Sequence, residues 1–266
     1  MSSPQAPGLI TSRDNPLVKE LRRLSEDSVA YRKYGHIWIE GEHLCRAALK
    51  RGVAPVRVIL SESADPADWM IAGVPTVVLS ESLMREVSTL ESPASVGFLL
   101  PLPESKSVLA GQPTVILDRL QDVGNVGSIL RSAAAFGVQQ VVALKGTAAL
   151  WGPKVVRAGM GAHFGLQLVE GVELGDLDGL DVPIVVTSSH HGLALNQARI
   201  PFPCAWVLGH EGQGIRPELA QRAALEVRIP QPGGEESLNV AAAAAICLYA
   251  GSANAPERAP DNGAPL

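Results

Sequence analysis

The stretch Val115-Ile-Leu-Asp118, followed by Asn125-Val-Gly127-Ser-Ile-Leu-Arg131, decides the fold class of this 266-residue chain. A short apolar run passes into a turn that contains Gly and Asn, and a helical pattern follows. A strand-to-helix turn of this kind presents free backbone N–H groups and polar side chains at the edge of a sheet, where ligands bind. The stretch therefore predicts an α/β fold with a ligand site at this edge.

Two later stretches have the same composition, and each lies where a strand is expected to end. The last of them lies about a hundred residues after the first turn and leads into an alanine-rich helical segment. They read Leu208-Gly-His-Glu-Gly-Gln-Gly214 and Ile229-Pro-Gln-Pro-Gly-Gly-Glu-Glu-Ser-Leu-Asn239-Val. Glycines on both sides of Glu211 indicate tight backbone geometry, which loops around a ligand often need.

Alternating patterns divide the chain into two α/β units. We expect a small domain over 9–100, a linker rich in Pro and Ser over 101–112, a second domain over 113–252 and a disordered tail over 253–266. The expected strands are 36–40, 56–60, 76–79, 94–100, 114–118, 140–144, 183–188, 204–208 and 225–229. The expected helices begin at Pro16 and cover 42–50, 83–87, 126–136, 153–161, 216–224 and 238–250, with Trp69 in a further helix. Strands that do not alternate between polar and apolar residues favour a parallel sheet covered on both faces.

Composition limits the classes of protein to consider. No apolar run reaches the roughly 18 residues that span a bilayer, and the first residues do not resemble a secretion signal, so we expect no membrane partner. Cys45, Cys204 and Cys247 are far apart and lack a CxxC pair or a histidine cluster. We interpret them as core residues, and they favour a reducing cytoplasm and no metal site.

The charge is uneven along the chain. Residues 1–57 carry a net charge of +4 and the remainder −9. A basic segment can bind phosphates locally, although a solvated helix face explains the same pattern. The RNA-binding candidates are Arg13, Lys19, Arg22, Arg23 and Arg32, together with Lys154 and Arg157, which share one helix face.

Arg131 lies in an otherwise apolar or small stretch, Ile129-Leu-Arg-Ser-Ala-Ala-Ala-Phe136. An arginine there must reach solvent, a carboxylate or a bound anion such as phosphate. Asn125 is expected to cap the helix that carries Arg131, and Ser237 to cap the last helix. A dinucleotide-binding loop is disfavoured because G-x-G-x-x-G and its following acidic residue are missing.

Taken in this order and spacing, the motifs resemble those of the SpoU (TrmH) family of RNA ribose 2′-O-methyltransferases. The first family motif, Asn-x-Gly-x-x-x-Arg, matches Asn125 to Arg131. The second, Leu-Gly-Asn-Glu-Gly-x-Gly, matches Leu208 to Gly214, except that His210 stands where asparagine is usual. The third, Ile-Pro…Ser-Leu-Asn-Val, matches 229–240. The stretch from Pro153 to Ala162 is also similar, with Gly159 where serine is common.

The resemblance implies an α/β-knot (SPOUT) methyltransferase domain with a deep trefoil knot, preceded by a small L30e-like domain that binds the RNA substrate. It also implies S-adenosyl-L-methionine as the cofactor and an obligate homodimer with the active site near the subunit boundary. The implied catalytic residues are Arg131, Asn125, Glu211, Ser237 and Asn239. The implied cofactor-binding residues are Leu208, Gly209, Gly214, Ile229, Leu238 and Asn239.

Arg131 has two alternative roles in this hypothesis. It acts as general base, although free guanidinium has a pKa of about 12.5 or higher, or it stays charged, holds a phosphate and orients the hydroxyl. The resemblance favours 23S ribosomal RNA over transfer RNA as substrate. A non-catalytic RNA-binding or ribosome-assembly protein and a small-molecule nucleotide enzyme are the remaining alternatives.

Overall fold

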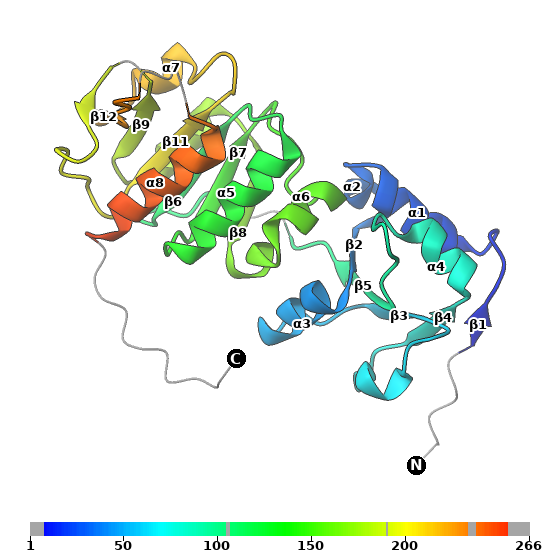
Figure 1. Ribbon diagram of the computed structural model, residues 1–266. Coiled ribbons are helices and arrows are strands. Elements are labelled where there is room, and N and C mark those ends of the chain that lie inside the picture. The colour runs from blue at the N-terminus through cyan, green and yellow to red at the C-terminus, as the bar shows by residue number, and fades with distance from the viewer. Residues whose placement is uncertain (1–7, 105–106, 190, 234–237, 255–266) are drawn as a thin grey trace.

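The computed structural model describes residues 8–104, 107–189, 191–233 and 238–254. Two sheets lie in two separate lobes, one built from the N-terminal and one from the C-terminal part of the chain (Figure 1). The predicted alternation of helices and strands is confirmed in both lobes.

The N-terminal lobe contains β1 (Leu9–Ile10), α1 (Pro16–Glu26), α2 (Ala30–Tyr34), β2 (His36–Glu40), α3 (Glu42–Lys50), β3 (Arg57–Ser61), η1 (Pro66–Asp68), β4 (Thr76–Leu79), α4 (Glu81–Val87) and β5 (Val96–Pro101). Its sheet has the order β1-β4-β3-β5-β2, in which β5 runs antiparallel to both of its neighbours. Asn15 caps α1 by accepting a hydrogen bond from the Leu17 N–H, and Pro16 occupies the first helical position.

The predicted helix around Trp69 is wrong. Pro66–Asp68 form one turn of 3-10 helix, and Trp69 follows that turn as its C-terminal cap. Only seven residues separate the cap residue Asp65 from Gly73, whose positive φ of 79° ends the segment, so a longer helix has no room. Trp69 is instead buried edge-on against Phe98, with ring centroids 5.9 Å apart.

The C-terminal lobe contains β6 (Thr114–Asp118), α5 (Val123–Ala135), β7 (Gln140–Leu144), α6 (Pro153–Gly159), η2 (Ala162–Gly165), β8 (Gln167–Val172), η3 (Leu174–Leu180), β9 (Ile184–Ser188), β10 (Leu193–Ala194), β11 (Ala205–Gly209), α7 (Pro217–Ala220), β12 (Leu225–Arg228) and α8 (Val240–Ser252). Its sheet has the order β10-β12-β9-β11-β6-β7-β8, and every pairing is parallel, as predicted. The edge strands β8 and β10 were not predicted, and α7 is shorter than the expected helix 216–224.

Both faces of the C-terminal sheet are covered. Val115 and Leu117 of β6 pack against side chains of α5, α6 and α8, whereas Ile116 between them packs against η3 and α7. Neighbouring side chains of a strand point to opposite faces, so a strand buried on both sides needs a continuous apolar run. This explains why Val115-Ile-Leu was informative.

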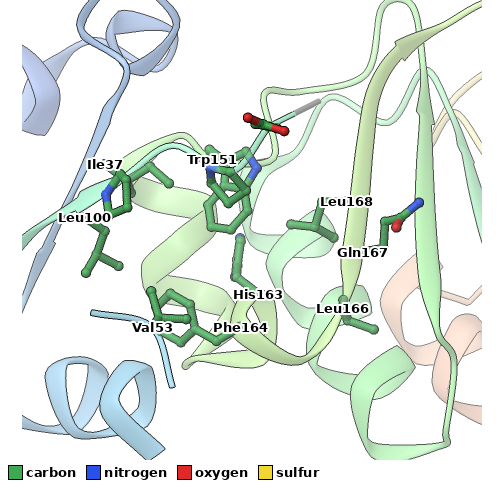
Figure 2. Close-up of a pocket in the computed structure, with 12 residues that line it drawn as sticks. Ile37, Val53, Leu100, Trp151, His163, Phe164, Leu166, Gln167 and Leu168 are labelled. Atoms are coloured by element: carbon green, nitrogen blue, oxygen red, sulfur yellow. The ribbon is translucent and has the colours of Figure 1, made fainter. Parts of the chain in front are cut away.

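The two lobes share an apolar interface. Trp151 and Val156 of the C-terminal lobe belong to the core of the N-terminal lobe. Glu170 of β8 accepts hydrogen bonds from the Tyr31 hydroxyl at 2.8 Å and from the Leu150 N–H at 2.7 Å. An apolar cavity of about 160 Å³ lies at this interface, and Ile37, Trp151 and Phe164 are among its lining residues (Figure 2).

The structure also tests predictions about single residues. Cys45, Cys204 and Cys247 are free and buried, as predicted, and burial raises the pKa of Cys204 and Cys247 to about 12. His163 is buried in η2. No helix among the described residues is long and apolar enough to cross a membrane. Residues 255–266 of the expected tail lie outside the described ranges.

Candidate functional site

The three motifs converge at one edge of the C-terminal sheet. Strands β6 and β11 are neighbours in parallel register, with Gly209 beside Asp118, and β12 lies two strands beyond β11, on the far side of β9. Because all strands are parallel, the turns that follow β6, β11 and β12 leave the sheet at the same edge. The segments around 119–125, 210–214, 229–233 and 238–239 therefore meet there, as the parallel α/β prediction required.

Three motif side chains are joined by hydrogen bonds across this edge. The Asn239 Nδ2 donates to Asn125 Oδ1 at 3.0 Å, and the Asn125 Nδ2 donates to Glu211 Oε1 at 3.3 Å. The Glu211 carboxylate also accepts from the backbone N–H groups of Gln121 and Asp122 at 3.4 and 3.2 Å. One carboxylate therefore links the first motif to the second, and Asn125 links both to the third.

The environment of Glu211 keeps its carboxyl group ionised. Partial burial alone raises the pKa of this group, but N–H groups from its own backbone, Asn125, Asp122 and Gln121 outweigh burial and hold the pKa below its usual value. Glu211 is therefore a fixed negative charge at neutral pH. It orients the amide of Asn125, since that amide must turn its donor toward the carboxylate.

The helix caps differ from the prediction. Asp122, rather than Asn125, caps α5, because its side chain accepts from the Asn125 N–H at 2.7 Å. Asn125 lies in the first turn of α5, so its amide is free to reach Glu211 and Asn239. Asn239 caps α8 by accepting from the N–H groups of Ala241 and Ala242, and Ser237, the predicted cap, lies outside the described residues.

A pocket of about 430 Å³ lies next to this cluster. Of the predicted cofactor-binding residues, it is lined by Gly209, Gly214, Ile229, Leu238 and Asn239. Leu208 is not among its lining residues, because its side chain points into the core below the sheet edge. A Cβ at Gly209 would lie 2.5 Å from the backbone of Gly214, so no larger residue fits where the loop folds back.

Gly127 has a packing role. A Cβ at this position would lie 2.4 Å from the Cβ of Ala158 and 2.9 Å from the carbonyl oxygen of Val155. The residue therefore brings α5 into close contact with α6.

Arg131 is exposed on α5 and does not line the pocket. Within the described residues its guanidinium makes no hydrogen bond or ion pair. It lies six residues after Asn125, which is about 9 Å along the helix axis. The exposed positions of this helix form one stripe, made of Gly124, Ser128, Arg131 and Ala135.

Sequence reasoning missed a second charged network at the same edge. Asp118 is fully buried at the end of β6, and it accepts from the backbone N–H and the Nε of Arg216 at 2.8 and 2.7 Å and from Arg119 Nε at 3.1 Å. Arg119 also donates to the side chain of Gln213. Burial alone raises the pKa of Asp118, but the hydrogen bonds from Arg216 and Arg119 outweigh it and lower the pKa. An acid that directly ends a buried apolar strand was the available signal.

The predicted RNA-binding cations fall into two groups. Arg13 and Arg22 both pair with Glu86, while Lys19 pairs with Asp14 and Arg32 with Glu170. Arg23 and Lys154 are exposed and have no such partner among the described residues, and Arg157 donates to the carbonyl oxygen of Thr89. The described residues contain no group of three or more His, Cys, Asp or Glu side chains that could hold a metal ion.

This arrangement suits positioning chemistry. The fixed carboxylate of Glu211 and the amides of Asn125 and Asn239 lie beside the pocket. Arg131 lies further along α5, the helix that carries Asn125. Such groups can hold a polar substrate in line with a second bound molecule. The pocket of about 430 Å³ provides room for that second molecule.

Comparison with known proteins agrees with this geometry. Residues 112–249 match the SpoU rRNA Methylase family, and residues 15–97 match the MRM3-like substrate binding domain. The chain is 31% identical over 244 residues to 23S rRNA (guanosine(2553)-2′-O)-methyltransferase RlmP of Bacillus subtilis, covering 90% of this chain and 97% of that protein. It is 28% identical to the human mitochondrial rRNA methyltransferase 3, covering 86% and 70%.

Solved structures show the same likeness. A putative RNA methyltransferase of the TrmH family from Porphyromonas gingivalis superposes with a TM-score of 0.80 at 30% identity, covering 90% of this chain and 97% of that chain. The AdoMet-bound rRNA methyltransferase from Sinorhizobium meliloti superposes with a TM-score of 0.82 at 25% identity, covering 94% and 99%. With the motifs, the fold and these relatives in agreement, the chain belongs to the SpoU family of rRNA methylases and carries an N-terminal substrate-binding domain.

Proposed function

We propose that this chain is an RNA 2′-O-ribose methyltransferase that uses S-adenosyl-L-methionine and acts on 23S ribosomal RNA. The observation that carries the proposal is the hydrogen-bonded cluster of Asn125, Glu211 and Asn239 beside a pocket at the edge of a parallel sheet. The name of the Bacillus subtilis relative, which matches nearly full length, supports the reaction and the RNA.

The residues around the pocket fit the proposed cofactor. Ile229 and Leu238 offer apolar surface to an adenine ring, and the backbone at Gly209 lies open because no side chain stands there. The solved structure of the Sinorhizobium meliloti relative is described as AdoMet-bound. S-adenosyl-L-methionine, when bound, supplies a methyl group activated by a sulfonium.

The chain's own side chains position the ribose. Glu211 orients Asn125, and Asn125 in turn holds Asn239, so the two amides present fixed hydrogen-bonding groups to the sugar. Arg131 approaches the ribose from the same helix and either removes the hydroxyl proton or binds the neighbouring phosphate while it orients the hydroxyl. Ser237, which lies outside the described residues, belongs to the same proposed set of catalytic residues.

The substrate RNA contacts both lobes in this proposal. Arg23 and Lys154 offer cations that no carboxylate neutralises among the described residues. Arg13, Lys19, Arg22, Arg32 and Arg157 stand around them but share their charge with protein groups. We therefore expect Arg23 and Lys154 to contribute most to phosphate binding.

We further infer that two copies associate through α5 and α8. On α8, Ile246 and Tyr249 are 41% and 68% exposed, and Tyr249 packs edge-on against Phe136 at the end of α5. This apolar surface continues into the small residues of the α5 stripe that contains Arg131. A homodimer formed by this face would bury the apolar side chains and place Arg131 near the boundary.

Two finer expectations complete the proposal. The C-terminal domain contains a deep trefoil knot in this proposal. The path of the chain supports it, because α8 follows β12 in sequence but packs against α5 and against β11 in the middle of the sheet (Figure 1). Stretching single molecules from both ends tests it, since a tightened knot shortens the final contour length. Three free buried cysteines support a cytoplasmic location, which cell fractionation tests.

The experiment that tests the proposed function is mapping of 2′-O-methyl groups in RNA from cells with and without this protein. We expect one methylated ribose in 23S ribosomal RNA to disappear when the protein is absent. Loss of a methyl group from transfer RNA would instead show that the enzyme class is right and the substrate wrong. Unchanged methylation, with no transfer by the purified protein, would favour a non-catalytic RNA-binding protein.

A further inference from the structure

The loop 210–214 forms one side of the pocket and is closed by two sets of hydrogen bonds. The backbones of His210 and Gly214 pair with each other, at 3.1 Å from His210 N–H to Gly214 oxygen and at 2.8 Å in the reverse direction. Inside the loop, the His210 Nδ1 accepts from the Gly212 N–H at 3.0 Å and from the Gln213 N–H at 3.2 Å. The imidazole thus holds the centre of the loop.

This geometry dictates the protonation state of the imidazole. Both partners of Nδ1 are backbone donors, so Nδ1 must carry a lone pair, and the neutral ring has its proton on Nε2. A proton on Nδ1 would point at two N–H groups and remove both hydrogen bonds. The closed loop is therefore compatible with the neutral ring and incompatible with the charged one.

The residue type at this position matters because an asparagine side chain also offers a hydrogen-bond acceptor but does not titrate. Glu211 follows His210 directly, and its carboxylate is held by Asn125 and backbone N–H groups on the other side of the loop. The other charged or titratable groups near the loop among the described residues are Asp118, Arg119, Asp122, His191 and Arg216. Asp118 is paired with Arg119 and Arg216, and histidine is the residue type in this set that can gain a proton near neutral pH.

We propose that His210 is a positioning residue for the cofactor loop, and that its neutral imidazole closes the loop while its protonation opens it. Cofactor affinity of this enzyme therefore falls in mild acid, a property that asparagine at the same position would not confer. The inference rests on the proposed function, because it requires that S-adenosyl-L-methionine binds the pocket beside this loop. Binding of the cofactor is then coupled to release of a proton from His210.

The test is calorimetric titration of the full chain with S-adenosyl-L-methionine between about pH 5.5 and about pH 8.5, the range in which histidine changes charge. We expect the affinity of the wild type to fall by at least ~10-fold at the acid end, the equivalent of about two neutral hydrogen bonds. His210→Asn should bind as tightly as the wild type at high pH and show little change with pH. His210→Ala should bind weakly throughout.

A matched control is His191→Asn, on the exposed segment after β9 and outside the residues that line the pocket. It should keep the pH dependence of the wild type. Equal pH dependence in the wild type and His210→Asn, or its loss in His191→Asn, would overturn the inference. Failure of the wild type to bind at any pH would instead contradict the proposed function.

A second readout does not need the cofactor. The ¹⁵N NMR spectrum of the histidine rings distinguishes the two neutral forms, and we expect the proton of His210 on Nε2. Assignment of that proton to Nδ1 at high pH would overturn the inference even if the cofactor binds normally. This measurement also applies to a variant whose affinity is too weak for calorimetry.

Discussion

Arg131 is a charged side chain on a helix stripe of small residues, and nothing in the described part of the chain neutralises it. We expect Arg131→Ala to lower turnover by at least ~10²-fold, the lower range for a group that takes part in proton transfer. Arg131→Lys should fail as well, because a point charge cannot reproduce the planar donor fork of guanidinium. Steady-state methylation assays with RNA measure both effects.

The affinity for S-adenosyl-L-methionine should stay close to that of the wild type in both variants, because Arg131 does not line the pocket. Arg199→Ala, which removes another exposed arginine, is a suitable control for charge alone. Normal turnover of Arg131→Ala would remove this residue from the mechanism.

Asp118 holds the turn after β6 against the loop after β11. Its fully buried carboxylate pairs with Arg216 at 2.6 Å and with Arg119 at 3.1 Å. We expect Asp118→Asn to lower the free energy of unfolding by about 3 kcal/mol, because it leaves two guanidinium groups without their anion. Denaturant titration measures this loss.

The exposed ion pair of Asp14 and Lys19 provides the comparison. Asp14→Asn should leave the free energy of unfolding nearly unchanged, because both partners are exposed to solvent. Equal effects of the two substitutions would show that the Asp118 network does not hold the sheet edge together.

The helix α6 packs against η2 through a close contact between Gly159 and His163. A Cβ at Gly159 would lie 2.5 Å from Cε1 of the buried His163 ring, whose Nε2 is bonded to the Leu150 carbonyl oxygen at 2.9 Å. This contact explains why position 159 of this chain requires glycine. We expect Gly159→Ala to destabilise the protein by about 1–3 kcal/mol in spite of its better helix propensity.

A double-mutant cycle separates the two causes. In a His163→Ala background, the same Gly159→Ala substitution should cost nothing or stabilise, because the ring is gone. Thermal unfolding of the four proteins gives the coupling energy. An unchanged cost in the His163→Ala background would mean that another contact restricts Gly159.

His163 also makes stability depend on pH. Burial lowers its pKa from 6.5 to about 4, even though the hydrogen bond to Leu150 acts in the opposite direction. Between these pH values the unfolded chain binds more protons than the folded chain, so stability falls as the pH drops through this window. The contribution of His163 to this loss is about 3 kcal/mol.

The pH dependence of stability is assigned to His163 by comparing variants, since carboxyl groups titrate in the same pH range. The free energy of unfolding of His163→Phe should fall less between about pH 7 and about pH 4 than that of the wild type. His43→Phe, at an exposed position of α3, should behave as the wild type. Identical pH profiles for wild type and His163→Phe would contradict the burial of a neutral ring.

The elements that sequence reasoning predicted well are those buried on both faces. Strands such as β6 and β7 are continuous apolar runs, and their bounds match the prediction. The edge strand β8 was missed because Glu170 and Gly171 interrupt its apolar pattern. Glu170 pairs with Tyr31 of the N-terminal lobe, and Gly171 lies at a shift in the register between β7 and β8. Pairing of Glu170 with Tyr31, 139 residues away in sequence, has no local signal.

The candidate site could likewise be predicted only in part from the sequence. Glycines and amides identified the turns, but which residue caps a helix and which bridges two turns depended on distances that spacing does not give. Asp122 takes the capping role, and this frees Asn125 to bridge Glu211 and Asn239. The ion pairs of Arg13, Lys19 and Arg22 likewise arise from the fold and alter their expected contribution to RNA binding.

For the whole molecule, the apolar face of α8 predicts dependence of activity on association. Ile246→Asp and Tyr249→Asp should each convert a dimer into a folded monomer, because a buried unpaired carboxylate is costly. Methyl transfer should fall by at least ~10-fold at concentrations where the monomer predominates. Light scattering after gel filtration and the RNA methylation assay measure the two properties together.

Met70→Asp gives a control at a side chain that is also more than half exposed, in the N-terminal lobe. It should remain dimeric and active. A wild-type protein that is monomeric and fully active would contradict the proposed role of this face.

The converging turns of the C-terminal sheet are proposed to transfer a methyl group to a ribose hydroxyl. Mass spectrometry of nucleosides from 23S ribosomal RNA, incubated with the purified protein and S-adenosyl-L-methionine bearing a deuterated methyl group, is the decisive measurement. We expect label on the 2′-oxygen of one nucleotide with the wild type and almost none with Arg131→Ala. Label on a nucleobase, or no label in any RNA that lacks the modification beforehand, would contradict it.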